Sequence, residues 1–423
     1  MTSEFLKAVS GHTALLRGGE SSRGLAAGDD WDFFVSDTDE ARSIASDYFG
    51  QPLLEKRNRY VEQRFYDWGG LDFLPGFEWN GWRYLDETQF WGKTFLDQDG
   101  VRKPCLAHDA FIAWFCGLLH GGNYKKRYDE LIFLAVQKER EEFRECLVWA
   151  FGKDWATDLE RMAMEKRPKD ALEVAADLRG AVKWQNLCRE GLFALGPVVA
   201  HWWTELKNHW EPPFPWITFL GPDGSGKSTV IDGLRTELAK CRIKLKHVHW
   251  RPTVRKPIPD EPGPPMTDPH GRPRRNVLLS VGALGLLLIR WWIGYPLRLL
   301  HARAKSHVIL SDRYYLDLLV DQQRYLYGGP DWLARFFLRF LPRPDFTAVL
   351  LTDADTILAR KAEVEKPELE RQLVAYRELA ESLGDRAVVV DVAQSAEEVV
   401  AEVTGVVKER FRERTALREG GGR

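Results

Sequence analysis

The chain divides into stretches with different patterns of hydrophobic and polar residues. Over 129–212, apolar residues recur at helical spacing, as in ELIFLAVQKEREEFRECLVWAF (130–151), which predicts a helical segment. After the hinge EPPFP (211–215), short apolar runs alternate with helical stretches, which is typical of a parallel sheet flanked by helices. The predicted strands of this sheet are WITFL (216–220), KHVHW (246–250), HVILSD (307–312), FTAVLLT (346–352) and AVVVDV (387–392).

The stretch before the helical segment has a third pattern, in which short strand-like runs alternate with Gly-rich turns. Residues 16–30 read as a loop, DFFV (32–35) as a strand, and RFYDWGGLDFL (64–74) as a hairpin or a pair of short strands. The sequence therefore predicts an α/β protein with an α+β domain (1–128), a helical segment (129–212) and a parallel-sheet domain (213–412). The Pro-rich stretch 251–275 predicts a mobile loop, and 413–423 predicts a disordered tail.

The first predicted strand of the parallel sheet leads into GPDGSGKST (221–229), which matches G-x-x-x-x-G-K-[ST] in full. In such a loop, backbone N–H groups and the following helix N-terminus cradle phosphate oxygens. Lys227 is expected to reach the β- and γ-phosphates of ATP, and the Ser228 hydroxyl is expected to ligate Mg²⁺. The predicted ATP-binding residues are Gly221, Asp223, Gly224, Ser225, Gly226, Lys227, Ser228 and Thr229.

A second motif, SDRYYLDLLVDQQRY (311–325), resembles the thymidylate kinase pattern D-R-[YFH]-x-x-S-x-x-A-Y-Q. The resemblance covers about 215–410 and implies a fold like that of nucleoside monophosphate kinases. It implies that Asp312 orders Mg²⁺ or its water, that Arg313 grips the acceptor phosphate, and that Asp223 faces the acceptor sugar. The remaining expected acceptor-binding residues are Arg251, Tyr314 and Gln322.

The stretch LARKAEVEKPELERQL (358–373) resembles the lid helix of this family. The phosphate loop carries no arginine, so basic lid residues are candidates to neutralise the transferring phosphoryl group. The alternative is a solvated charged face with i,i+4 pairs. The candidate lid cations are Arg360, Lys361, Lys366 and Arg371.

Several positions depart from the family pattern. Asp317 and Asp321 replace its Ser and Tyr, and the second strand ends in His-Trp-Arg-Pro, without the family's Arg-Glu-Pro. Added carboxylates would repel a second phosphate. The family pattern predicts a nucleoside monophosphate as the acceptor. The departures from that pattern predict a sugar, polyol or glycan instead. Divergent proteins of this kind resemble those of bacterial polysaccharide gene sets.

The N-terminal region carries a looser motif. Gly18-Gly19, a ten-residue spacer and Asp30-Trp31-Asp32-Phe33 resemble the nucleotidyltransferase superfamily. That resemblance implies a metal site made by Asp30, Asp32 and a third carboxylate, for which Asp72 is the candidate. The alternative is a domain that has kept this fold for recognition alone.

Composition narrows the remaining possibilities. Lys and Arg (60) nearly balance Asp and Glu (62), which argues against a nucleic-acid partner. Five scattered cysteines and an N-terminal stretch without a long apolar core suit a cytoplasmic protein.

The group Cys105, His108, Cys116 and His120 lies in an apolar helical stretch and predicts core packing, because its spacing matches no usual zinc site.

The apolar stretch 277–300 is interrupted by Arg290, Pro296 and Arg298, so we expect it not to span a membrane. It predicts either a buried helix or a helix resting on the inner membrane surface.

Three functions follow from the sequence: an ATP-dependent kinase, a bifunctional nucleotidyltransferase–kinase, and a non-enzymatic ATP-gated module at a membrane surface. The sequence predicts neither the acceptor's identity nor the oligomeric state.

Overall fold

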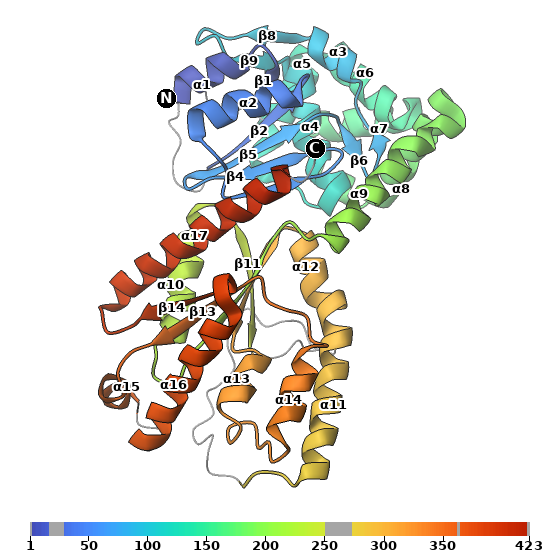
Figure 1. Cartoon of the computed structure of the whole chain (residues 1–423). Helices are drawn as coiled ribbons and strands as arrows, with labels where there is room; N and C mark the ends of the chain where they lie inside the picture. The colour runs from blue at the N-terminus through green and yellow to red at the C-terminus, as the bar shows by residue number, and fades with distance from the viewer. Residues whose placement is uncertain (1, 17–28, 250–272, 362–363, 421–423) are drawn as a thin grey trace. The chain divides into compact units, whose positions relative to one another are not determined.

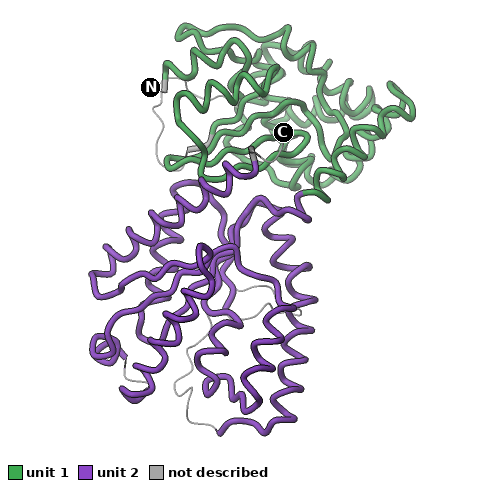
Figure 2. The backbone as a smooth tube through the Cα atoms, in the orientation of Figure 1, with its two compact units in different colours: residues 1–207 green, residues 208–423 purple. Residues whose placement is uncertain are grey.

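A computed structural model describes residues 2–16, 29–249, 273–361 and 364–420 (Figure 1). The chain forms two compact units, residues 1–207 and 208–423 (Figure 2). Two expectations fall outside the described residues: most of the loop predicted over 16–30, and nearly all of the Pro-rich loop predicted over 251–275.

Unit 1 is built on a mixed five-stranded sheet of order β1-β2-β5-β4-β3. The central strands β2 and β5 run parallel, and the other neighbours are antiparallel. The strand predicted at 32–35 lies within β2, and the hairpin or strand pair predicted over 64–74 is the antiparallel pair of β4 and β5, which begins earlier, at Glu62. The strands of unit 1 are β1 (Thr13–Leu15), β2 (Asp29–Val35), β3 (Leu54–Arg57), β4 (Glu62–Phe65), β5 (Gly69–Leu74), β6 (Glu78–Trp79), β7 (Trp82–Arg83), β8 (Thr94–Leu96) and β9 (Arg102–Pro104).

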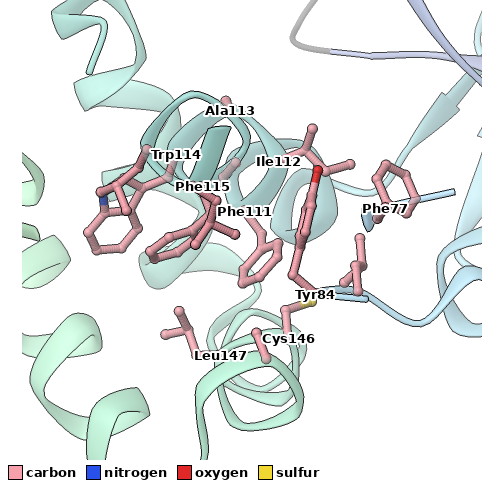
Figure 3. Packing of buried hydrophobic residues seen from close by; sticks show 14 of the residues in the cluster. Phe77, Tyr84, Phe111, Ile112, Ala113, Trp114, Phe115, Cys146 and Leu147 are labelled. Carbon is pink, nitrogen blue, oxygen red and sulfur yellow. The ribbon is translucent and has the colours of Figure 1, made fainter. Parts of the chain in front are cut away.

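Helix α4 (Leu106–Gly121) forms the centre of the main hydrophobic core of unit 1. It packs against α5, α6 and α8, and Figure 3 shows Phe111 and Phe115 on α4 near Cys146 and Leu147 on α6. The core draws residues from both sides of position 128, because the apolar surface of α4 needs the later helices to cover it. The structure therefore places 1–207 in one unit, where the sequence suggested a boundary at 128. The helices of unit 1 are α1 (Thr2–Val9), α2 (Thr38–Phe49), α3 (Glu87–Gly92), α4, α5 (Asp129–Lys138), α6 (Arg140–Phe151), α7 (Lys153–Met164), α8 (Ala175–Glu190) and α9 (Leu195–Trp210), the last of which continues into unit 2.

Of the cysteine and histidine group on and before α4, Cys105 and Cys116 are partly buried and pack against the core, as predicted. His108 is buried, and its Nδ1 lies 3.4 Å from Cys105 Sγ. Burial lowers the pKa of His108 to about 4, so its ring is neutral at physiological pH. Within the described ranges, no group of three or more His, Cys, Asp or Glu side chains could hold a metal ion.

Unit 2 contains a five-stranded, fully parallel sheet of order β11-β12-β10-β13-β14. This confirms the predicted parallel sheet flanked by helices, and each strand begins and ends within two residues of its prediction. The strands are β10 (Trp216–Leu220), β11 (Lys244–His249), β12 (His307–Asp312), β13 (Phe346–Leu351) and β14 (Ala387–Asp391). The helices are α10 (Lys227–Lys240), α11 (Val277–Gly294), α12 (His301–Ala304), α13 (Tyr315–Val320), α14 (Asp331–Leu338), α15 (Ala354–Arg360), α16 (Lys366–Leu383) and α17 (Ala396–Gly420).

The C-terminal stretch differs from its prediction. Helix α17 continues to Gly420, so residues 413–420 are helical and not a disordered tail. Arg414 donates to Asp345 Oδ1 and to the Pro212 carbonyl, and Arg418 donates to the Glu211 carbonyl. These contacts hold the end of the helix against the start of unit 2, and composition alone does not reveal them.

The apolar stretch 277–300 is neither fully buried nor fully exposed. Helix α11 is followed by a π-helical turn, Tyr295–Leu300, at the position where Pro296 cannot donate a helical hydrogen bond. Among the described residues, Val277–Ala304 is the one stretch long and apolar enough to cross a membrane, and only 33% of its most apolar window is buried. One face packs on the core of unit 2 and the other is exposed.

Candidate active site

The phosphate loop lies at the carboxyl edge of the parallel sheet in unit 2. It connects β10 to α10, and β12 and β13 pair with β10 on either side. The loop needs glycine at three points of its backbone, Gly221, Gly224 and Gly226, where φ is positive. Gly221 has φ 143°, and a Cβ there would lie 2.4 Å from the Leu350 carbonyl, while Gly226 has φ 81°. This is the point in an open α/β sheet where ligands bind.

Lys227 is buried and lies under the loop that it is expected to serve. Its Nζ donates to the carbonyls of Gly221 and Pro222, at 2.8 Å each. Burial and the nearby charge of Arg313 lower the pKa of Lys227 to about 8, although Asp223 and Asp312 act in the opposite direction. Ser228 and Thr229, one and two residues further on, are exposed at the start of α10.

Asp312, the last residue of β12, lies beside the loop. Burial opposes its ionisation, but the bond from His249 and the charges of Lys227 and Arg313 outweigh this and lower the pKa of Asp312 to about 2. Its Oδ1 is buried without a hydrogen-bond partner among the described residues, as is Ser225 Oγ. An ionised carboxylate oxygen with spare capacity and an exposed hydroxyl at Ser228 are the oxygen donors that Mg²⁺ prefers, so these residues fit the cation.

Arg313 follows Asp312 and occupies an unusual backbone conformation. Its φ is 71°, which is uncommon for a residue other than glycine, and its N–H donates to the Phe219 carbonyl at 3.0 Å. The guanidinium binds Asp223 through Nη2 and Asp317 Oδ2 through Nη1, the latter at 2.6 Å. Strain of this kind persists where the surroundings hold a side chain in a working position.

Asp317 departs from the family pattern, and the structure shows where it lies. It is fully buried and accepts hydrogen bonds from Tyr325 Oη, at 2.7 Å, and from Tyr376 Oη. Burial opposes its charge, but Arg313 and the two tyrosines outweigh burial and lower the pKa of Asp317. The carboxylate therefore neutralises and orients the Arg313 guanidinium.

A pocket next to the loop brings together residues from five segments of the chain. The lining residues include Asp223 and Arg313, Asp321 and Arg324 after α13, Lys361 at the end of α15, and Gln372 and Tyr376 on α16. Arg324 donates to Asp223 through Nη1, so one carboxylate serves two guanidinium groups. Three cations and two carboxylates line the pocket, which leaves it with a net positive charge of one.

The pocket contains some of the expected acceptor residues but not others. Tyr314 is buried in the core, where it meets Trp216 and Trp291 edge-on and donates to the Pro342 carbonyl. The Gln322 amide donates to Asp331, and its oxygen accepts from Arg274 at 3.4 Å. Neither side chain lines the pocket, because each already has partners elsewhere. Arg251 lies outside the described residues.

The stretch that resembles a lid is two helices, since α15 ends at Arg360 and α16 begins at Lys366 with Pro367 in its first turn. Arg360 donates to the Val392 carbonyl, Lys366 binds Asp355 and Arg371 binds Glu368. These three candidates are thus directed to structural partners. Of the candidate lid cations, Lys361 lines the pocket.

Arg324, Tyr325 and Tyr376 also belong to this site and were not predicted from the sequence. Arg324 follows Gln322 by two residues, and a basic residue in the loop after Asp-Arg-Tyr was a usable signal. Tyr376 lies on α16, far along the chain, and no local pattern distinguishes it from a core tyrosine.

In unit 1, the two described strands of the looser motif place two carboxylates side by side. Asp32 on β2 and Asp72 on β5 are Cα partners across the parallel pair, and Gln63 Nε2 lies 3.1 Å from Asp72 Oδ2. The side chain of Asp30 lies outside the described residues, so the three-carboxylate site stays a prediction.

A phosphate loop on a parallel sheet, with a charged pocket at the same edge, is typical of P-loop nucleotide-binding proteins. The chain is 30% identical over 213 residues to a thymidylate kinase of Enterococcus faecalis, a match that spans 47% of this chain and 97% of the relative. It is 29% identical over 195 residues to a probable thymidylate kinase of Methanocorpusculum labreanum, spanning 44% of this chain and 92% of that relative. Through this part of its length, the chain belongs to the thymidylate kinase family. No protein-family model matches the chain.

Proposed function

We propose that unit 2 transfers the γ-phosphoryl group of Mg²⁺-bound ATP to the phosphate of a nucleoside monophosphate. The carrying observation is that Arg313 and Arg324 converge on Asp223 in a pocket beside the phosphate loop. Two fixed, planar guanidinium groups can each donate a pair of hydrogen bonds to the charged oxygens of a phosphate. Family membership supports phosphoryl transfer as the reaction class.

The donor nucleotide is proposed to bind over Gly221–Thr229. Lys227 would leave the carbonyls of Gly221 and Pro222 and turn to the β- and γ-phosphates, whose charge stabilises its protonated form. Ser228 and Asp312 would hold Mg²⁺ or its water. The ion supplies charge neutralisation when bound, and the loop holds the phosphates in line.

The acceptor is proposed to enter the pocket, with its phosphate on Arg313 and Arg324 and a sugar hydroxyl on Asp223. In this arrangement, the two carboxylates that depart from the family pattern do not argue strongly against a phosphate-bearing acceptor. Asp317 is buried behind Arg313, and Asp321 accepts from the backbone N–H of Arg324 at 3.1 Å. Lys361 is proposed to add the positive charge that Arg360, Lys366 and Arg371 do not bring to the pocket.

Steady-state kinetics of Arg324→Ala test this proposal. Losing one charged contact to the acceptor phosphate should lower kcat/KM for thymidine monophosphate by about 10- to 100-fold and leave the KM for ATP nearly unchanged. Arg377→Ala, an exposed arginine on α16, is the matched control. Equal effects on ATP and acceptor would contradict the assignment. Turnover with sugars or polyols, insensitive to Arg324→Ala, would favour a neutral acceptor.

A second candidate function concerns unit 1. The Asp32–Asp72 pairing supports nucleotidyl transfer there, with metal held between strands β2 and β5. The reaction would release pyrophosphate from a nucleoside triphosphate, which separates it from kinase turnover. Pyrophosphate release that persists in Asp32→Asn would contradict this candidate.

A further inference from the structure

Helices α11 and α14 of unit 2 both present apolar side chains to solvent. On α11, Leu286, Ile289 and Ile293 follow helical spacing and are exposed, Ile289 by 51%. On and just after α14, Trp332, Phe336 and Phe340 recur every fourth residue, and Trp332 is 67% exposed. The two helices contact each other, and Trp292 Nε1 donates to the Phe340 carbonyl at 2.8 Å. We call these six residues the α11–α14 face.

The opposite side of α11 is fastened to the kinase core. Leu284, Leu288 and Trp291 are buried in the same hydrophobic cluster as Trp216 of β10, and Trp291 stacks on Trp216 with centroids 5.4 Å apart. A helix held this way cannot cross a bilayer without leaving the core of its own domain. Only its exposed face is available to a partner.

The exposed charges beside this face are mostly positive. No Asp or Glu occurs between 273 and 311. Arg335, Arg339 and Arg343 are exposed on or just after α14, where the single acidic residue is Asp331 at its start. Leu, Ile, Trp and Phe on one face with arginines beside them is the composition of helices that lie in the interface of an anionic membrane.

We propose that the α11–α14 face docks the protein on the surface of an anionic lipid bilayer. Its apolar side chains enter the headgroup region and its arginines bind lipid phosphates. A second copy of the chain is the competing occupant. A two-fold contact through this face would gather the arginines of both copies at one interface, and like charges repel. A membrane supplies the opposite charge.

Flotation of the full chain with vesicles tests the proposal. The protein is expected to float with phosphatidylcholine vesicles that contain phosphatidylglycerol and to remain largely unbound with phosphatidylcholine alone. Removing arginines should weaken partitioning by about fivefold for each residue, so Arg335→Ala/Arg339→Ala should bind about thirtyfold less. Trp332→Ser/Phe336→Ser should also lose binding, because it removes the inserted side chains.

Matched controls come from other exposed positions of unit 2. Leu417→Ser removes an exposed apolar residue on α17, and Arg386→Ala removes an exposed arginine. Both should float like the wild type, and thermal unfolding checks that every variant is folded. Absence of flotation with anionic vesicles would overturn the proposal. So would flotation unchanged in both double variants, or a dimer in solution that Trp332→Ser/Phe336→Ser dissociates while the wild type fails to bind vesicles.

Discussion

The candidate sites of the two units, one at the sheet of each, are encoded in the sequence in different ways. In unit 2, one continuous stretch, 221–229, supplies the loop, the buried lysine and the exposed hydroxyls. In unit 1, Asp32 and Asp72 become neighbours only through the parallel pairing of β2 with β5. A local motif defines its chemistry wherever the strand–helix context is right. A motif made from distant carboxylates depends on register and on side-chain direction, so it is the weaker basis for assigning an activity.

Removing the buried lysine should give the largest effect at the unit 2 edge. Lys227→Ala is expected to lower kcat for phosphoryl transfer by at least about 10²–10³-fold, because it deletes a positioned charge from the transferring phosphates. ADP release at saturating ATP measures this loss. Lys240→Ala, at the exposed end of the same helix, should keep wild-type turnover. Equal turnover in the two variants would contradict the role of the loop.

Asp317→Ala tests the buried support behind Arg313. Breaking the buried pair leaves the Arg313 guanidinium without its 2.6 Å partner and should lower the free energy of unfolding of unit 2 by about 3–5 kcal/mol. Urea unfolding followed by circular dichroism measures it. Asp355→Ala removes an exposed ion pair with Lys366 and should leave the free energy of unfolding nearly unchanged, because solvent screens such pairs. Similar losses in both variants would show that Asp317 has no special structural role.

Nucleotide binding should depend on pH through Lys227. The free protein holds this group at a pKa of about 8, and bound phosphate favours the protonated form. The association constant for ATP should therefore be largest below pH 8. It should fall as the pH rises through 8, by a factor that approaches ten for each pH unit. Calorimetry from about pH 6.5 to about pH 9.5 measures the slope, and Lys227→Arg should remove it because arginine stays protonated. A flat wild-type profile would contradict the assignment.

Substitutions at the sheet edge of unit 1 should have the smallest effect on phosphoryl transfer. Asp32→Asn/Asp72→Asn should leave ATP-dependent phosphoryl transfer within about twofold of wild type, because these residues belong to unit 1. The same variant decides whether unit 1 has chemistry of its own, through pyrophosphate release. A large loss of kinase turnover in a folded variant would mean that the two edges serve one reaction.

Local sequence patterns predicted much of unit 2 and less of its pocket. The strands 216–220 and 307–312 match the structure residue for residue, because buried parallel strands read as short apolar runs between polar turns. Tyr314 was expected at the acceptor and lies in the core, because the motif does not reveal which way its side chain points from the chain. Arg324 and Tyr376 reach the pocket only through the packing of α13 and α16.

The basic residues of 358–373 also show that local sequence does not reveal which distant residues a side chain contacts. The resemblance to a lid helix suggested that its basic residues reach the phosphoryl group, but Arg360 binds the Val392 carbonyl and Arg371 binds Glu368. Helix spacing identifies neighbours on one helix and does not identify partners on other elements. The helical end of the chain was missed for the same reason, since Arg414 is held by Asp345, far away in sequence.

The most direct test of the account is to incubate the full chain with ATP, Mg²⁺ and thymidine monophosphate, with Lys227→Ala in parallel, and to measure ADP and thymidine diphosphate together. The account predicts equal amounts of both products from the wild type and neither from the variant. ADP formed through Lys227 without thymidine diphosphate would contradict the proposed acceptor while leaving the ATP site intact. Thymidine diphosphate formed equally by both proteins would contradict the central claim that this loop carries the reaction.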